Sequence, residues 1–201
     1  MEGFLRVEYE SCLGLIRYYD ERHQSLVKFT TAISSSVISL VFGFRAFGAD
    51  AQSHFWSFAA VLTAVAALGL LAVFVAMVQN RLYFIYPVRQ VNAIRRAMLA
   101  KVASDFADNQ MYTSTEVRAF KLFSLHSLMN VLVAAQIGVF IGVSWFSISF
   151  NSADLRSSIR WALVISSAFS IGLFALSGWY LTVSGRRHAD QSVHRVKDRA
   201  K

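Results

Sequence analysis

Apolar residues along this chain gather in four long stretches that alternate with charged segments. The clearest stretch covers residues 55–80, where 26 residues without a charged side chain would form about 39 Å of helix. Residues 122–153 and 161–184 are also uncharged, and residues 29–44 form a shorter stretch between Lys28 and Arg45. Because about 20 apolar residues cross a bilayer as a helix, each stretch predicts a membrane span.

The fold class that this pattern predicts is an all-α integral membrane protein, a four-transmembrane-helix bundle with amphipathic cytoplasmic helices. The first span is expected over residues 26–48, because basic side chains at its ends can reach toward the headgroups. The other spans are expected over 55–80, 122–150 and 161–184, with short outer loops at 49–54 and 151–160. An amphipathic cytoplasmic helix at 1–25, a basic amphipathic cytoplasmic segment at 81–121 and a basic cytoplasmic tail at 185–201 complete the prediction.

The distribution of lysine and arginine predicts which side of the membrane each segment faces. Of the 20 basic residues, 4 precede residue 29, 7 lie in 81–121 and 6 lie in 186–201, which leaves 3 for the two short loops. Since cytoplasmic segments are enriched in positive charge, both termini are expected in the cytoplasm. This asymmetry suits a bacterial inner membrane, although a protein of the endoplasmic reticulum would obey the same rule. Anionic inner-leaflet lipids are the expected contacts of Arg89, Arg95, Arg96, Lys101, Arg186 and Arg187.

Composition excludes most other classes of protein. The chain is 55% hydrophobic and only 16% charged, whereas soluble domains average about 25% charged residues. This composition argues against a soluble globular fold and against a disordered chain. Cys12 is the only cysteine, so the sequence predicts neither a disulfide framework nor a thiolate metal site, and no cofactor is expected.

Two segments outside the spans have helical periodicity. Leu5, Cys12, Tyr19 and Leu26 recur at every seventh position and predict a helix that lies on the membrane, packs on the bundle or docks a partner. The only proline, Pro87, predicts a bend or the first turn of a new helix, followed by a basic amphipathic helix on the inner leaflet.

Another helix is expected from Ser114 into the third span, with Thr113 as its cap.

Small and polar residues recur at every fourth position on two of the predicted spans. On the first span they are Thr31, Ser35, Ser39 and Gly43, and on the third they are His126, Asn130, Ala134, Gly138 and Gly142. Such faces allow helices to approach closely and hydroxyls to bond across the contact, so packing within the chain is favoured. In an assembly of several copies the same faces would instead line a pore. No charged side chain lies deep in a span, which argues against proton pumping, voltage sensing and tight binding of a charged substrate.

Candidate chemistry is sparse. Arg17 and His23 have five residues between them, and Arg187 and His194 have six. This spacing resembles the Arg–His motif of the HEPN nuclease family, whose active sites form where two such helices meet; the resemblance covers seven or eight residues each time. The residue after Arg is polar in the commoner form of the motif, so His188 fits it and Tyr18 departs from it.

Metal and nucleic acid are not expected as ligands. His188 and His194 do not have the i,i+4 spacing of metal ligands on one helix face. The basic tail has no interleaved aromatic residues on which bases could stack.

The function that follows is non-enzymatic, with no catalytic residue: a self-associating membrane component or an anchor for a cytoplasmic partner. The expected partners are the bilayer and either further copies of the chain or a cytoplasmic protein. The first alternative is an oligomeric pore-forming effector or channel subunit, since the overall plan is similar to that of small four-span proteins of bacterial defence systems. The second is a membrane-tethered HEPN-like nuclease acting through Arg187 and His194.

Overall fold

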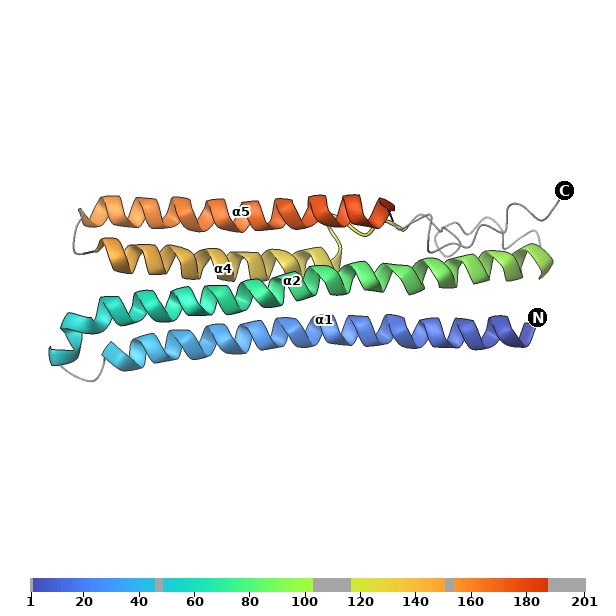
Figure 1. The fold of residues 1–201 in the computed structure, drawn as a ribbon, viewed down its shortest axis with the longest axis horizontal. Coiled ribbons are helices and arrows are strands. Elements are labelled where there is room, and N and C mark those ends of the chain that lie inside the picture. Colours follow the sequence, from blue (N-terminus) through green and yellow to red (C-terminus); the bar gives the residue numbers. More distant parts are fainter. Residues whose placement is uncertain (1, 46–48, 103–116, 151–153, 188–201) are drawn as a thin grey trace. The chain divides into compact units, whose positions relative to one another are not determined.

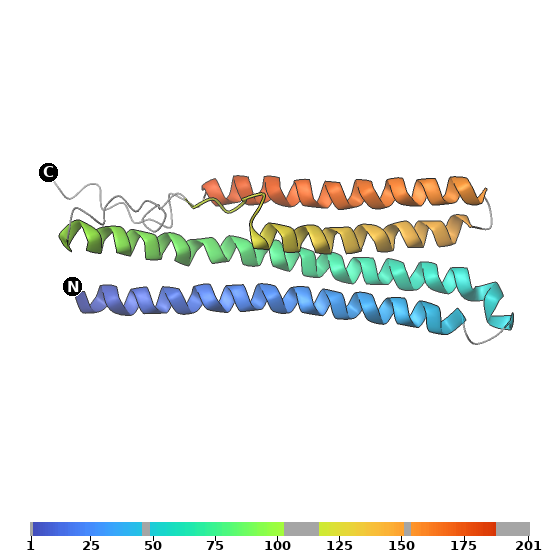
Figure 2. The ribbon, with the colours of Figure 1, turned by 180° about the vertical axis from the view of Figure 1, so that it is seen from behind.

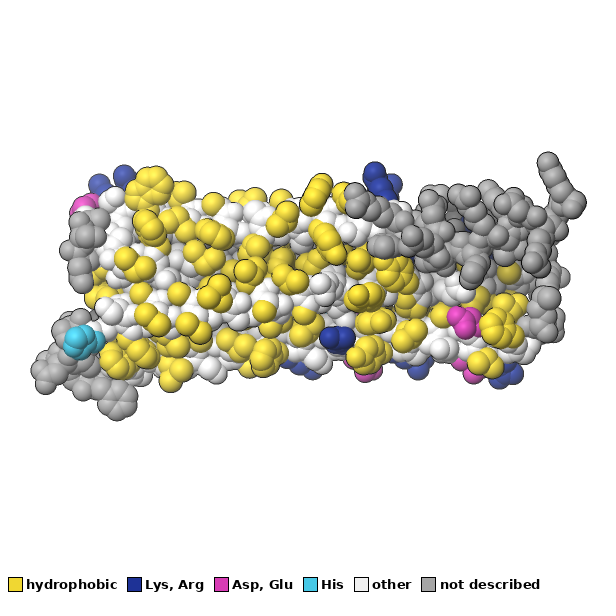
Figure 3. All heavy atoms as spheres, viewed as in Figure 1, with side chains coloured by type: hydrophobic (Ala, Val, Ile, Leu, Met, Phe, Trp, Pro, Cys, Tyr) yellow, Lys and Arg dark blue, Asp and Glu magenta, His cyan; other side chains and the backbone are white. Residues whose placement is uncertain are grey.

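The protein is all-helical in the ranges that its computed structural model describes, which are residues 2–45, 49–102, 117–150 and 154–187. These ranges contain four α-helices (Figure 1): α1 (Glu2–Arg45), α2 (Ala49–Val102), α4 (Leu125–Ser149) and α5 (Leu155–Arg187). Each helix contains a stretch long and apolar enough to cross a membrane, as the sequence predicts. The face shown in Figure 3 is accordingly rich in hydrophobic side chains.

Two of the helices are longer than a bilayer is thick. The 44 residues of α1 and the 54 of α2 correspond to about 66 and 81 Å, whereas a bilayer with its headgroups measures about 40–45 Å. In α1 the charged residues precede Phe29 and the uncharged stretch follows it. Each of these helices therefore joins a membrane-length stretch to a charged continuation without a break.

Pro87 lies inside α2 and does not begin a new helix. Proline lacks an N–H group, so the helix loses the bond to the carbonyl of Tyr83 at a cost of about 3 kcal/mol. Burial of neighbouring side chains such as Ile85 and Val91 offsets this loss, because each stabilises the fold by about 1.5–3 kcal/mol. Of the two alternatives that the sequence left open for this proline, the start of a new helix is excluded, because α2 continues to Val102.

Three other boundaries differ from the sequence prediction. Residues 49–54 and 155–160, expected in outer loops, belong to α2 and α5. Residues 117–124 are not helical, so no helix runs from Ser114 into the third span; Thr113 and Ser114 themselves lie outside the described residues. Instead α4 begins after Ser124, whose hydroxyl accepts a hydrogen bond from the N–H of Ser127 at 3.3 Å.

The chain divides into two compact units. The first, called here the polar unit, comprises residues 1–23, 78–121 and 178–201. The second, called the apolar unit, comprises residues 24–77 and 122–177. Helices α1, α2 and α5 each contribute to both units.

Within the apolar unit, neighbouring helices follow the order of the chain (Figures 1 and 2). Phe44 of α1 stacks on Phe58 of α2 with ring centres 4.4 Å apart. The hydroxyl of Ser144 in α4 donates a hydrogen bond to the carbonyl of Ala60 in α2 at 3.0 Å. Because α4 contacts α5 through its opposite side, α1 and α5 lie at the two edges of this unit.

The contact between α4 and α5 depends on small residues. A Cβ added at Gly142 would lie 2.7 Å from the carbonyl oxygen of Ala162 and 3.0 Å from the Cβ of Ser166. A Cβ added at Gly138 would overlap the carbonyl of Ser166 and the hydroxyl of Ser170. Both helices thus present small residues at every fourth position, which brings their backbones close together.

Candidate functional site

Arg89 of α2 joins three segments of the polar unit. Its Nε and Nη2 atoms donate hydrogen bonds to the carbonyl oxygen of Val117 at 3.1 and 2.8 Å. Its Nη1 atom donates to the carbonyl oxygen of Gly185 at 3.0 Å. Gly185 lies in the last turn of α5, where carbonyls have no partner inside the helix and where positive charge is favourable. Arg89 therefore caps α5 while holding the segment before α4.

Arg81, two helical turns before Arg89, acts on the same segment. Its Nε atom donates to the carbonyl oxygen of Ala119 at 3.0 Å, and its guanidinium lies 5.1 Å from the centre of the Phe84 ring. Backbone carbonyls of a non-helical segment need partners when they are buried. Arg81 and Arg89, called here the arginine clamp, supply those partners for residues 117–119.

Two glycines of α5 allow the clamped segment to lie directly on that helix. A Cβ added at Gly185 would lie 2.7 Å from the Cβ of Ala119. A Cβ added at Gly178 would lie 3.0 Å from the ring of Phe120. Any side chain at these positions would displace residues 119–120, so the glycines and the clamp determine together where the segment sits.

The first part of α1 packs on α2 through a side that includes Cys12 and Tyr19, two of the heptad positions. Tyr9 accepts a hydrogen bond from Nη2 of Arg95 at 2.9 Å, and the carbonyl of Tyr19 accepts one from Nδ2 of Asn80 at 2.7 Å. Cys12 lies between these contacts and is buried. The amphipathic stripe of residues 3–26 is therefore a packing seam between helices.

The side of α1 that faces away from this seam carries a second set of apolar side chains. Four of these side chains are more than two-fifths exposed and are called here the outward stripe: Phe4 (71%), Val7 (66%), Leu15 (43%) and Tyr18 (54%). Successive members of the stripe are three, eight and three residues apart. This part of α1 is rich in charged residues and precedes the uncharged stretch. Contiguous exposed apolar side chains outside a membrane usually mark an interaction surface.

The polar face predicted on the first span is exposed as well. Thr31, Ser35, Ser39 and Gly43, called here the hydroxyl face, are all exposed among the described residues. The Thr31 hydroxyl bonds to the carbonyl of Val27 in its own helix at 3.0 Å. Residues 30, 34 and 37 form the buried side of this stretch instead. The described helices therefore leave this face uncovered.

The corresponding face of the third span lies inside the apolar unit. All five predicted residues are buried, and they are His126, Asn130, Ala134, Gly138 and Gly142. The two glycines contact α5, as described above. The Oδ1 atom of Asn130 is buried and accepts no hydrogen bond from the described residues.

The basic residues predicted to contact lipid headgroups differ in their surroundings. Arg96 and Arg186 are exposed, and Arg95 is half-buried against Tyr9. Arg89 is only 4% exposed and forms the clamp, so in this structure its guanidinium is not available to a headgroup. The side chains of Lys101 and Arg187 lie outside the described residues.

Catalytic or metal-binding chemistry has no assembled group in the part of the chain that the structure describes. Arg17 is exposed and His23 is fully buried, and six residues of helix separate them by about 120° around the axis. His194 lies outside the described residues. Within the described ranges no three metal-ligating side chains come together.

Sequence reasoning missed Arg81 and the structural role of Arg89, although a signal was present. Phe74, Met77, Arg81, Ile85 and Arg89 are buried at spacings of three or four residues along α2. The two arginines thus lie on the same side of α2 as the buried apolar residues of the span, beyond the end of the span. A charged residue on the buried side of a helix is expected to be paired or hydrogen-bonded, which distinguishes these arginines from Arg96.

Comparison with protein-family models, with curated proteins and with solved structures finds no match to this chain, so its function is argued from its own residues.

Proposed function

We propose that this protein is a non-enzymatic membrane component that self-associates through exposed surfaces of α1. The observation that carries the proposal is the polarity of these surfaces, which is the reverse of what each stretch of the helix would be expected to expose. The outward stripe exposes Phe4 and Val7 in the charged part of α1, and the hydroxyl face exposes Ser35 and Ser39 in the uncharged part. Water disfavours the first group and lipid disfavours the second, whereas a protein surface accommodates both.

A second copy of the chain could cover both of these surfaces. Copies inserted in one membrane have the same orientation, so two α1 helices would meet in parallel. The spacings of three, eight and three residues keep the side chains of the outward stripe on one side of the helix. A hydroxyl group is both a donor and an acceptor, so the hydroxyl face is complementary to itself about a two-fold axis.

The proposal includes the topology predicted from charge. Both termini would lie in the cytoplasm of a cell whose inner membrane holds the protein, because 17 of the 20 basic residues would then be on the inner side. Exposed Arg96 and Arg186 would contact anionic lipids of the inner leaflet.

Disulfide cross-linking in native membranes tests the proposal. In a Cys12→Ala background, Leu15→Cys places a thiol in the outward stripe and Ser39→Cys places one in the hydroxyl face. Arg17→Cys and Leu40→Cys are the respective controls, because each places a thiol on another exposed side of the same stretch of α1. We expect cross-linked dimers from Leu15→Cys and Ser39→Cys and few from the two controls. Equal yields from all four, or none from the first two, would contradict self-association through these surfaces.

A pore is the second candidate, because hydroxyls such as Ser35 and Ser39 could line a conduit in a larger ring. Native mass spectrometry separates the candidates by copy number. A dimer supports a membrane component without a conduit, whereas five or more copies with ion flux in liposomes support a channel. Cross-linking of Leu15→Cys to a different protein, without a dimer, would instead support an anchor for a cytoplasmic partner.

A further inference from the structure

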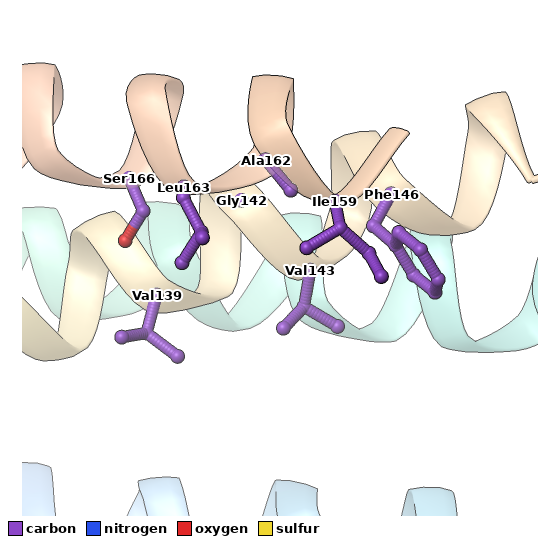
Figure 4. Close-up of a pocket in the computed structure, with 8 residues that line it drawn as sticks. All are labelled: Val139, Gly142, Val143, Phe146, Ile159, Ala162, Leu163 and Ser166. Carbon is purple, nitrogen blue, oxygen red and sulfur yellow. The ribbon is translucent and has the colours of Figure 1, made fainter. Parts of the chain in front are cut away.

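A groove runs along the α4–α5 pair of the apolar unit (Figure 4). Its volume is about 280 Å³, and residues of both helices line it: Val139, Gly142, Val143, Phe146, Ile159, Ala162, Leu163 and Ser166. In Figure 4 Val139 and Val143 of α4 and Ile159 and Leu163 of α5 flank the small residues between them. The groove exists because Gly142 and Ala162 bring the backbones together and leave no side chain to fill the space above them.

Two arginines stand at one end of this groove. Arg156 lies three residues before Ile159 and seven before Leu163, so it is on the same side of α5 as these two residues. It lies about one helical turn closer to the start of α5 than Ile159. Arg160 lies beside it in the next turn. Both side chains are exposed and form no hydrogen bond or ion pair with the described residues.

Tryptophans place this end of the helices at the membrane surface. Trp145 of α4 and Trp161 of α5 are both about half exposed near the same end of the apolar unit. Tryptophan is enriched where hydrocarbon meets the headgroups. Arg156 and Arg160 lie on the headgroup side of Trp161, whereas the groove extends from there into the apolar region.

We propose that this groove binds one acyl chain of a phospholipid whose anionic headgroup is held by Arg156 and Arg160. Charge selects a phospholipid over a helix of a second copy. A two-fold contact through this face would bring the same two arginines of a second copy to the groove, whereas an anionic headgroup complements them. The groove of about 280 Å³ is lined mainly by apolar residues, which suits a hydrocarbon chain. The proposal does not depend on the contact through α1.

Native mass spectrometry of delipidated protein with added lipid tests this site. Phosphatidylglycerol is the anionic probe and phosphatidylcholine is the zwitterionic comparison. We expect the natural protein to retain phosphatidylglycerol preferentially. Arg156→Gln and Arg160→Gln should each lower that retention about fivefold and leave phosphatidylcholine unchanged, since one basic residue contributes about 1 kcal/mol to binding an anionic lipid.

Filling the groove should remove both lipids. Val139→Trp places a large ring in it from an exposed position, and Val131→Trp makes the same change on an exposed position of α4 outside the groove. We expect loss of bound lipid from Val139→Trp and no change from Val131→Trp. Equal retention of the two lipids by the natural protein, or equal effects of the two tryptophans, would overturn the proposal. A change in copy number without a change in bound lipid would show that protein occupies the groove.

Discussion

The Nη1 atom of Arg89 lies 3.0 Å from the carbonyl oxygen of Gly185, although 96 residues separate the two in the sequence. The same guanidinium holds the carbonyl of Val117. One buried side chain of α2 thus caps α5 and positions the segment that leads into α4.

Replacing Arg89 by methionine should destabilise the polar unit strongly. The change would leave the carbonyls of Val117 and Gly185 without their donors, and each such buried group costs about 1–3 kcal/mol. Thermal unfolding in detergent measures the effect, with exposed Arg96→Met as the control. We expect a lower midpoint for Arg89→Met alone, and equal midpoints would refute the role of the clamp.

Gly142→Ala should weaken the contact between α4 and α5. The new Cβ would lie 2.7 Å from the carbonyl oxygen of Ala162, so the helices must separate, and overpacking of this kind costs about 1–3 kcal/mol. Gly172→Ala on α5 is the matched control, because its Cβ would meet no atom within 4 Å. Unfolding by denaturant should show a loss of stability for the first variant only.

Gly185→Ala and Gly14→Ala should have effects of opposite sign. At Gly185 the added Cβ would lie 2.7 Å from Ala119 and would displace the clamped segment. At Gly14, inside α1, it meets nothing, so alanine should stabilise the helix by about 0.5–1 kcal/mol. Thermal unfolding in detergent should show a lower midpoint for Gly185→Ala and a higher one for Gly14→Ala. A midpoint for Gly185→Ala that is not lowered would mean that this glycine does not position the segment.

Tyr9→Phe should have a small effect of about 0.5–1.5 kcal/mol. It removes the hydroxyl that accepts a hydrogen bond from Arg95 but keeps the ring, which lies 5.5 Å from the guanidinium carbon. A double-mutant cycle with Arg95→Met measures the coupling directly. Additive effects of the two substitutions would show that this contact does not hold α1 on α2.

The helices could be predicted from the sequence because their signals are local. An uncharged stretch of membrane length and a heptad repeat of apolar residues each specify a helix wherever the rest of the chain lies. At Pro87 the sequence left a bend and a new helix open, and α2 continues because burial of side chains such as Ile85 and Val91 offsets the cost of about 3 kcal/mol of a proline in a helix. The start of α4 was misplaced because residues 117–120 are held by Arg81 and Arg89 from another part of the chain.

A local sequence pattern does not determine which face of a helix becomes buried. Small and polar residues at every fourth position occur on α1 and on α4, yet Gly138 and Gly142 are buried whereas Ser35 and Ser39 are exposed. Spacing makes a face suitable for close contact but does not say which neighbour reaches it. By itself the sequence determined four membrane-length helices and an asymmetric charge. Only the tertiary structure decided which polar groups are enclosed, because burial depends on the position of a helix among its neighbours.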